Sequence, residues 1–272
     1  MKMLIASLAM VGIGLGMVGT AGVLASETEL KIEQVISGES LNISEELPSF
    51  KNINIEGGLT DIEILEGDKF YIEATAKELE GKFSYKVENN TLFVEHENKD
   101  NNFNFLKMDK IIDVKIYVPK DTNLNEIETE NGIGDMLVYG LDMERLDIEA
   151  GVGKITIEDV IADEFEFEGG VGDVTCKNIT FYDTKIEAGM GAVELEGDFD
   201  GDIMIEGGMG DISITTTREY SDYNFKIEAG LGNISVNDNK YGLFEGDINE
   251  NRGGKHMIDA EVGMGSIDIK TN

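Results

Sequence analysis

A carboxylate recurs once per repeat in this chain, two residues before each Gly–apolar–Gly triplet. The seven glutamates at this position are Glu130, Glu149, Glu168, Glu187, Glu206, Glu228 and Glu261. If the repeats stack in register at about 4.8 Å, these side chains form a column. Neighbouring charges about 5 Å apart then repel by roughly 0.8 kcal/mol in water, and more where water is excluded. Such a column needs hydrogen bonds, screening ions or a bound cation.

Two explanations of the column compete. Either each glutamate accepts hydrogen bonds from its own glycine corner while salt screens the rest, or the column binds cations. The pairs that could converge on a cation are Glu130 with Asp135, Glu168 with Asp173, and Glu206 with Asp211. Calcium takes about six to eight oxygen ligands, and Lys154 and Ala192 replace the aspartate at other corners. The ligand set is incomplete, so we expect no metal and no other cofactor.

Catalytic side chains are abundant but do not form a recognisable site. Acid and base pairs of the kind that hydrolyse polysaccharides can be drawn at will from 55 Asp and Glu residues, which makes each pair uninformative. The single cysteine, Cys176, falls at an inward strand position, and His96 and His256 lie in unrelated, loop-like segments. We therefore expect no catalytic residues and no enzymatic activity. A polysaccharide-active β-helix enzyme is the alternative.

A sequence repeat positions these side chains. Its corner glycines are Gly132, Gly134, Gly151, Gly153, Gly170, Gly172, Gly189, Gly191, Gly208, Gly210, Gly230, Gly232, Gly263 and Gly265. The first five triplets begin 19 residues apart, and the last two intervals are 22 and 33 residues. A fixed period of this size is typical of stacked-repeat folds, and glycine suits a tight corner because positive φ is free of steric cost without a Cβ.

Each repeat contains two half-buried strands. Leu146, Ile148, Ile155 and Ile157 alternate with polar residues on both sides of a corner, and a period of two predicts strands with one inward face. One repeat alone cannot bury its apolar row, but stacked repeats can. The pattern predicts an all-β fold, a single elongated parallel β-solenoid of 19-residue coils stacked in sequence order. We expect the apolar residue between the two glycines, such as Val152, to point inward.

The expected organisation has three parts. Residues 1–25 form an N-terminal hydrophobic helix, residues 26–49 a linker, and residues 50–272 the β-solenoid. Within the solenoid, 50–126 is an irregular opening part and 127–272 contains the regular Gly-x-Gly coils.

The N-terminal helix has two interpretations. Met3 to Ala25 is uncharged and follows Lys2, and 23 residues at 1.5 Å each reach across the roughly 30 Å core of a bilayer. It is either a cleaved signal peptide or a membrane anchor. Both predict export: the body is secreted to the cell surface or anchored in the cell membrane and facing outside.

The chain is strongly acidic, with a formal net charge of −33. Nucleic acid is excluded as a partner, because phosphate binding requires basic patches. A hydrophobic fraction of 41% with regular alternation argues against disorder.

One segment resembles a known family. Residues Ile116 to Leu124, which read Ile-Tyr-Val-Pro-Lys-Asp-Thr-Asn-Leu, precede repeated strand–Gly-x-Gly–strand units. Over residues 50–272 this arrangement is similar to the bacterial "putative adhesin" family, a domain of unknown function. The resemblance implies a β-solenoid that is commonly exported or membrane-tethered in Gram-positive-type bacteria, and some similar proteins accompany cell-envelope stress systems. The family offers no catalytic residues to transfer.

These observations favour a non-enzymatic, exported module of the cell envelope. Its repetitive acidic face would bind or adhere to a protein or a cell-wall polymer, and its N-terminal segment would contact the membrane. A membrane-tethered accessory protein of a cell-envelope stress response is an alternative that shares the same anchor and body.

Overall fold

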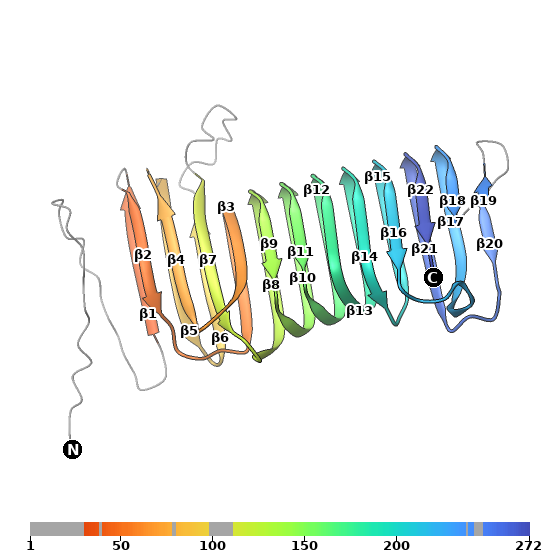
Figure 1. Cartoon of the computed structure of the whole chain (residues 1–272). Helices are drawn as coiled ribbons and strands as arrows, with labels where there is room; N and C mark the ends of the chain where they lie inside the picture. The colour runs from red at the N-terminus through yellow and green to blue at the C-terminus, as the bar shows by residue number, and fades with distance from the viewer. Residues whose placement is uncertain (1–29, 38–39, 78–79, 98–110, 238, 242–246) are drawn as a thin grey trace, which may run out of the picture.

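The computed structural model describes residues 30–37, 40–77, 80–97, 111–237, 239–241 and 247–272. Within these ranges the protein is all-β, as predicted, and its strands join into one 22-stranded sheet. The helical element found there is a short 3-10 turn, η2 (Tyr220–Asp222). Figure 1 shows the strands side by side in a long stack of narrow coils.

The central coils follow the sequence repeat. Each has a longer strand and a shorter strand on opposite sides of a glycine corner. The longer strands are β8 (Asn123–Ile133), β10 (Asp142–Val152), β12 (Ile161–Val171) and β15 (Ile203–Met209). The shorter ones are β9 (Met136–Tyr139), β11 (Ile155–Glu158), β14 (Val193–Phe199) and β16 (Ile212–Thr216). A continuous strand, β13 (Val174–Met190), supplies the short side of one coil and the long side of the next.

Parallel pairing joins these coils at the predicted offset. Leu146 of β10 lies opposite Phe165 of β12, which lies opposite Thr184 of β13. Each step is 19 residues, so equivalent residues stack along one axis and give the body a solenoid-like form.

The inward residues of both sides form the core. Leu146, Ile148, Ile155 and Ile157 are each at most 1% exposed, and burying such a side chain contributes about 1.5–3 kcal/mol. Phe181 adds an aromatic ladder across the coils, because its ring centroid lies 4.9 Å from that of Phe165 and 6.4 Å from that of Phe199. The alternation in the sequence therefore translates directly into burial.

The coils do not all stack in sequence order, which corrects one expectation. The last elements are β17 (Tyr223–Leu231), β18 (Ile234–Val236), β19 (Asn239–Tyr241), β20 (Ile248–Glu250), β21 (His256–Met264) and β22 (Ile267–Lys270). β21 pairs in parallel with β15 on one side and with β17 on the other. The final coil is thus inserted between two earlier ones. The other edges of β18 and β17 pair antiparallel with β19 and β20. Ile258 and Ala260 of β21 are consequently fully buried.

A similar insertion occurs near the start. The upstream strands are β1 (Leu30–Ser37), β2 (Leu41–Glu46), β3 (Asn52–Gly67), β4 (Tyr71–Ala76), β5 (Glu80–Glu88), β6 (Thr91–Glu97) and β7 (Ile112–Pro119). β3 lies between β6 and β7 on one side and β8 and β9 on the other, with parallel pairing throughout. The expected linker, residues 26–49, is wrong for its described part: β1 and β2 pair antiparallel with β5 and β4.

The apolar residues between the corner glycines point outward, so the expectation that they point inward is wrong. Val152, Val171 and Met209 are each 42% exposed, and Leu231 is 63% exposed. The alternation of inward and outward side chains breaks at the corner, where the second glycine takes a positive φ in six of the seven triplets, for example +144° at Gly191.

The N-terminal hydrophobic helix expected over Met3 to Ala25 lies outside the described residues. Among those that are described, no helix has both the length and the apolar character needed to cross a membrane.

Candidate functional site

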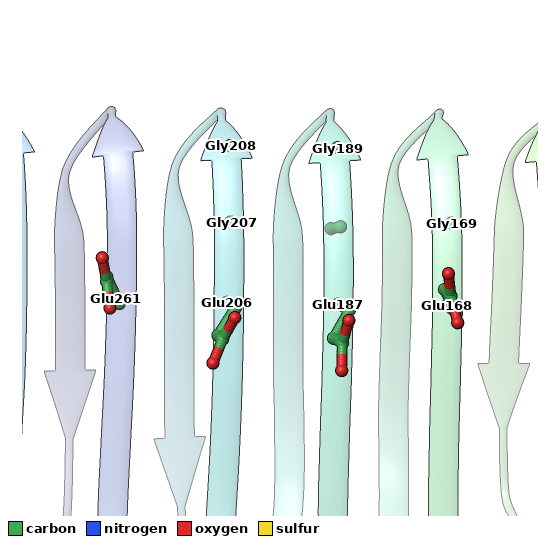
Figure 2. Close-up of a pocket in the computed structure, with 9 residues that line it drawn as sticks. Glu168, Gly169, Glu187, Gly189, Glu206, Gly207, Gly208 and Glu261 are labelled. Atoms are coloured by element: carbon green, nitrogen blue, oxygen red, sulfur yellow. The ribbon is translucent and has the colours of Figure 1, made fainter.

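The predicted glutamates form one column on the outer surface. Consecutive members are direct partners in the parallel registers, and the structure adds Glu56 of β3, from which we count the column. Beyond it, Glu56 lies opposite Glu95 of β6, whose carboxylate accepts a hydrogen bond from Ser84. In spatial order the column contains Glu56, Glu130, Glu149, Glu168, Glu187, Glu206, Glu261 and Glu228. Figure 2 shows four of them side by side on β12, β13, β15 and β21.

A groove runs beside this column. Two open hollows of about 380 and 390 Å³ share Glu168 and Gly169 and together extend from Glu130 to Glu261. Their floor is formed by the first glycines of the triplets, and it lies on the corner side of the glutamates in Figure 2. We call the column and this floor the glutamate groove. The groove exists because these outward positions carry no side chain.

The close stacking of backbones requires these glycines. A Cβ on Gly132 would lie 2.6 Å from the carbonyl oxygen of Gly58 in the neighbouring coil. At Gly153, whose φ is +159°, a Cβ would collide with the carbonyl oxygen of Gly134. The corner column therefore lets the coils approach, and it also holds the glutamates at strand spacing.

Most of the column lacks a cationic partner. Lys185 Nζ lies 2.9 Å from Glu187, and Lys226 Nζ lies 3.8 Å from Glu228. No basic side chain in the described part of the chain pairs with the other six. The pKa of Glu149 is raised above its usual value, first by desolvation and then by the charges of Glu168 and Glu130. The groove thus carries concentrated negative charge that two lysines compensate only in part.

The basic residues on this face are already occupied. Arg145 donates hydrogen bonds to Glu164 at 2.7 Å, to Asp147 at 2.7 Å and to Glu166 at 2.8 Å. Lys185 first and Arg145 second lower the pKa of Glu166. These ion pairs engage Arg145 and Lys185 mainly with carboxylates of the rows next to the column.

The predicted aspartates have another role. Asp173 Oδ1 accepts a hydrogen bond from the backbone N–H of Ala192 at 2.9 Å, and Asp211 Oδ1 accepts one from Ser266 at 2.8 Å. Asp135 has the same role at its corner. Each aspartate thereby ties one coil to the next.

The cation pairs considered from the sequence do not form a metal site. Within the described ranges, no three His, Cys, Asp or Glu side chains are grouped to hold a metal ion. The pairs concerned are Glu130 with Asp135, Glu168 with Asp173, and Glu206 with Asp211. The hollows of the groove are lined by glutamates and contain none of these aspartates.

An exposed apolar row lies beyond the glycine floor, where the sequence pattern predicted inward side chains. Its exposed members follow their glutamates by three residues and are direct partners between coils: Val152, Val171, Met190, Met209, Met264 and Leu231. At about 3.3 Å per residue, this row lies roughly 10 Å from the glutamate column along the strands. The flanking glycines could have indicated the outward direction of these side chains, since they interrupt the strand alternation.

A second missed feature is a buried polar cluster where β3, β6 and β8 meet. His96 is 7% exposed, and its Nδ1 lies 3.4 Å from Thr60 Oγ1. Asn131 Nδ2 donates to the Thr60 carbonyl at 2.8 Å, while His96 Nε2 and Asn131 Oδ1 have no hydrogen-bond partner. Burial lowers the pKa of His96 to about 4. His96 continues the inward alternation of Leu92 and Val94, which was the available signal.

Cys176 is fully buried, as its sequence position predicts. Burial raises the pKa of its thiol, so the reactive thiolate is disfavoured. The side chain packs as a small hydrophobe.

Known proteins are similar to most of the strand-containing part of this chain. The family described as Toastrack DUF4097 matches residues 50–261, and no curated protein matches the chain. A "putative adhesin" from Bacteroides fragilis NCTC 9343 has 17% identity, with 87% of this chain and 98% of that chain covered and a TM-score of 0.55. This similarity supports the fold.

Two further solved structures are similar at lower scores. A "putative cell adhesion protein" from Clostridium sporogenes ATCC 15579 has 17% identity, with 87% of this chain and 100% of that chain covered and a TM-score of 0.39. A "putative lipid binding protein" from Parabacteroides distasonis ATCC 8503 has 14% identity, with coverages of 87% and 99% and a TM-score of 0.39.

Proposed function

This chain belongs to the Toastrack DUF4097 family, and we propose that it is a non-enzymatic module which binds a surface partner through the acidic face of its coils. The observation that carries the proposal is the glutamate groove. Six of its eight carboxylates have no ion pair with a described basic residue, whereas Arg145 and Lys185 pair with carboxylates of the neighbouring rows. A partner that supplies positive charge would relieve this repulsion.

The shape of the face supports binding over an area. The carboxylates stand in one column along open hollows, whereas glycosidases place two carboxyl groups on opposite sides of the scissile bond. Solenoids commonly recognise partners over extended repetitive surfaces. The partner proposed from these properties is a protein or a cell-wall polymer that carries cationic groups.

The proposed location is outside the cell membrane. It is supported by the uncharged run Met3 to Ala25 after Lys2, which has the length of a membrane span or a signal sequence. Mass analysis of membrane and secreted fractions tests it. A mature protein that retains the run in membranes indicates an anchor, one that lacks it indicates cleavage, and a full-length protein confined to the cytoplasm contradicts export.

Retention on cells tests the binding function. The full-length chain is incubated with washed cells of the source organism, and with their isolated walls, at low and high salt. We expect the triple variant Glu149→Gln, Glu168→Gln, Glu206→Gln to lose most of its retention. The matched control, Glu144→Gln, Asp163→Asn, Glu196→Gln, removes three exposed carboxylates outside the groove. Equal retention of both variants would contradict a role for the groove.

A further inference from the structure

The glutamate column and the apolar row run in parallel over six consecutive coils. Eight coils contribute a glutamate, so the column has seven intervals of about 4.8 Å and is roughly 34 Å long. Six coils add an exposed Val, Met or Leu between the corner glycines. The stack therefore carries a negative stripe and a parallel apolar stripe, with the glycine floor between them along the strands. Figure 2 shows the glutamates and the glycines of that floor.

The spacing of this face matches an α-helix laid along the stack. A helix rises about 5.4 Å per turn, close to the coil spacing of about 4.8 Å, so side chains at i, i+4 and i+7 meet successive coils. Over the six turns of a 22-residue helix the two repeats drift apart by about 4 Å in total, which flexible Lys and Glu side chains absorb. An extended strand fits less well, because its side chains on one face repeat at about 6.8 Å.

The width matches as well. The two stripes are roughly 10 Å apart along the strands, and a helix with side chains is about 10–12 Å across. The glycine floor leaves room for the body of the helix, and the exposed methionines can adapt to varied apolar side chains.

From these matches we propose that the glutamate groove and the apolar row together form the docking surface for a basic amphipathic α-helix of about 22 residues. Its Lys or Arg stripe lies on the glutamates, and its adjoining apolar stripe lies on Val152, Val171, Met190, Met209 and Met264. This inference rests on the proposed function and specifies its partner. A second copy of this chain is disfavoured on the same face, because like charges would meet.

A pair of synthetic peptides tests the inference on the full-length protein. One 22-residue peptide of Lys, Leu and Ala places Lys and Leu on adjoining stripes, and the other has the same composition in scrambled order. We expect the amphipathic peptide to bind at least tenfold more tightly by titration calorimetry. Its circular dichroism should show helix formation on binding.

Two triple variants separate the stripes. We expect Glu149→Gln, Glu168→Gln, Glu206→Gln to weaken binding about tenfold or more and to reduce its salt dependence. We expect Val171→Thr, Met190→Thr, Met209→Thr to weaken binding several-fold with the salt dependence unchanged. These side chains are exposed, and an unchanged melting temperature would show that the fold is intact. The control triple variant, at Glu144, Asp163 and Glu196, should bind like the wild type.

Three results would overturn the inference. They are equal affinity for the scrambled peptide, binding without helix formation, and an apolar-row variant that binds like the wild type. Stronger binding to zwitterionic lipid vesicles than to the amphipathic peptide would instead assign the apolar row to a membrane. If the peptide fails while retention on cells still depends on the three groove glutamates, the docking proposal fails and the binding function stands.

Discussion

Asp135 and Lys154 are joined across neighbouring coils: Asp135 Oδ1 accepts a hydrogen bond of 2.8 Å from the backbone N–H of Lys154. The same link recurs from Asp61 to Asp135, where the Asp61 carboxylate accepts from the Asp135 amide at 2.8 Å. A charged acceptor strengthens such a bond. The aspartates at the corners therefore act as connections between coils and are distinct from the glutamates of the groove.

Replacing one connecting aspartate should destabilise the stack modestly. Asp173→Ala leaves the Ala192 amide without its acceptor, and we expect a loss of about 1–2 kcal/mol in the free energy of unfolding. Asp173→Asn keeps an acceptor oxygen and should lose less. Urea denaturation of both variants measures the difference. Equal losses would contradict the hydrogen-bond role.

Calcium should have no specific effect, since the aspartates are engaged by backbone amides. We expect millimolar calcium to change the melting temperature as much as magnesium at equal ionic strength. A large rise with calcium alone would restore the cation explanation.

A corner glycine should tolerate no side chain. Gly172→Ala places a Cβ against the carbonyl oxygen of Gly153 at a φ of +152°, and we expect a loss of more than about 3 kcal/mol or failure to fold. Gly207→Ala is the control, because its Cβ would meet Val262 Cγ2 at 3.3 Å and no positive φ is involved. Similar stability of the two variants would contradict the packing of the corners.

Neutralising one groove glutamate should stabilise the protein. The pKa of Glu149 is raised by desolvation and by Glu168 and Glu130, so ionising this carboxyl is less favourable in the folded than in the unfolded state. The contribution of Glu149 to the free energy of unfolding is therefore present at low pH, where the carboxyl is protonated, and is lost as the pH rises through the raised pKa. We expect Glu149→Gln to melt at a higher temperature than the wild type at pH 7.

The effect of Glu149→Gln should shrink in high salt and disappear near pH 4. Differential scanning fluorimetry at two salt concentrations, and at pH 7 and pH 4, checks both. A lower melting temperature for the variant at pH 7 would show that Glu149 has a stabilising partner.

His96 should make the protein sensitive to mild acid. Its pKa is lowered by burial to about 4, whereas an exposed histidine titrates near 6.5. The unfolded chain therefore takes up a proton between these values and the folded chain does not. The free energy of unfolding should therefore decrease as the pH is lowered from about 6.5 to 4, by up to roughly 3 kcal/mol in total.

His96→Leu should remove this component of the pH dependence. Urea midpoints at pH 7 and pH 5 measure it, with His256→Gln as the control. An unchanged pH dependence in His96→Leu would show that the pKa of His96 is the same in the folded and the unfolded state.

Cys176 should be inert in the native protein. It is fully buried, and burial raises the pKa of its thiol. We expect no reaction with a bulky thiol reagent until denaturant is added, as measured by mass spectrometry. Rapid labelling of the native protein would contradict the inward register of β13.

The sequence was sufficient for the central coils and for the glutamate column. Apolar residues such as Ile148 and Ile157 alternate strictly, and the 19-residue spacing leaves one parallel register that aligns Glu149 with Glu168. Both properties are local in the chain, so periodicity reveals them.

Other features depend on interactions between distant segments. β21 lies between β15 and β17. The spacing of Gly230 and Gly263 in the sequence does not show which of these strands β21 pairs with. The exposure of Val152 depends on the local backbone of the glycine corner, where the strand alternation breaks. The environment of His96 requires the pairing of β3 with both β6 and β8.

The insertion of β21 and β22 has a consequence for biosynthesis. Residues 256–270 fill a slot between coils that are translated before them, at residues 203–216 and 223–236. Until the ribosome has released this late segment, the coil at 223–236 has no parallel neighbour to stack on. A nonsense mutation after Lys255 would therefore open a gap inside the assembled rod, where a simple end-to-end array would merely become shorter.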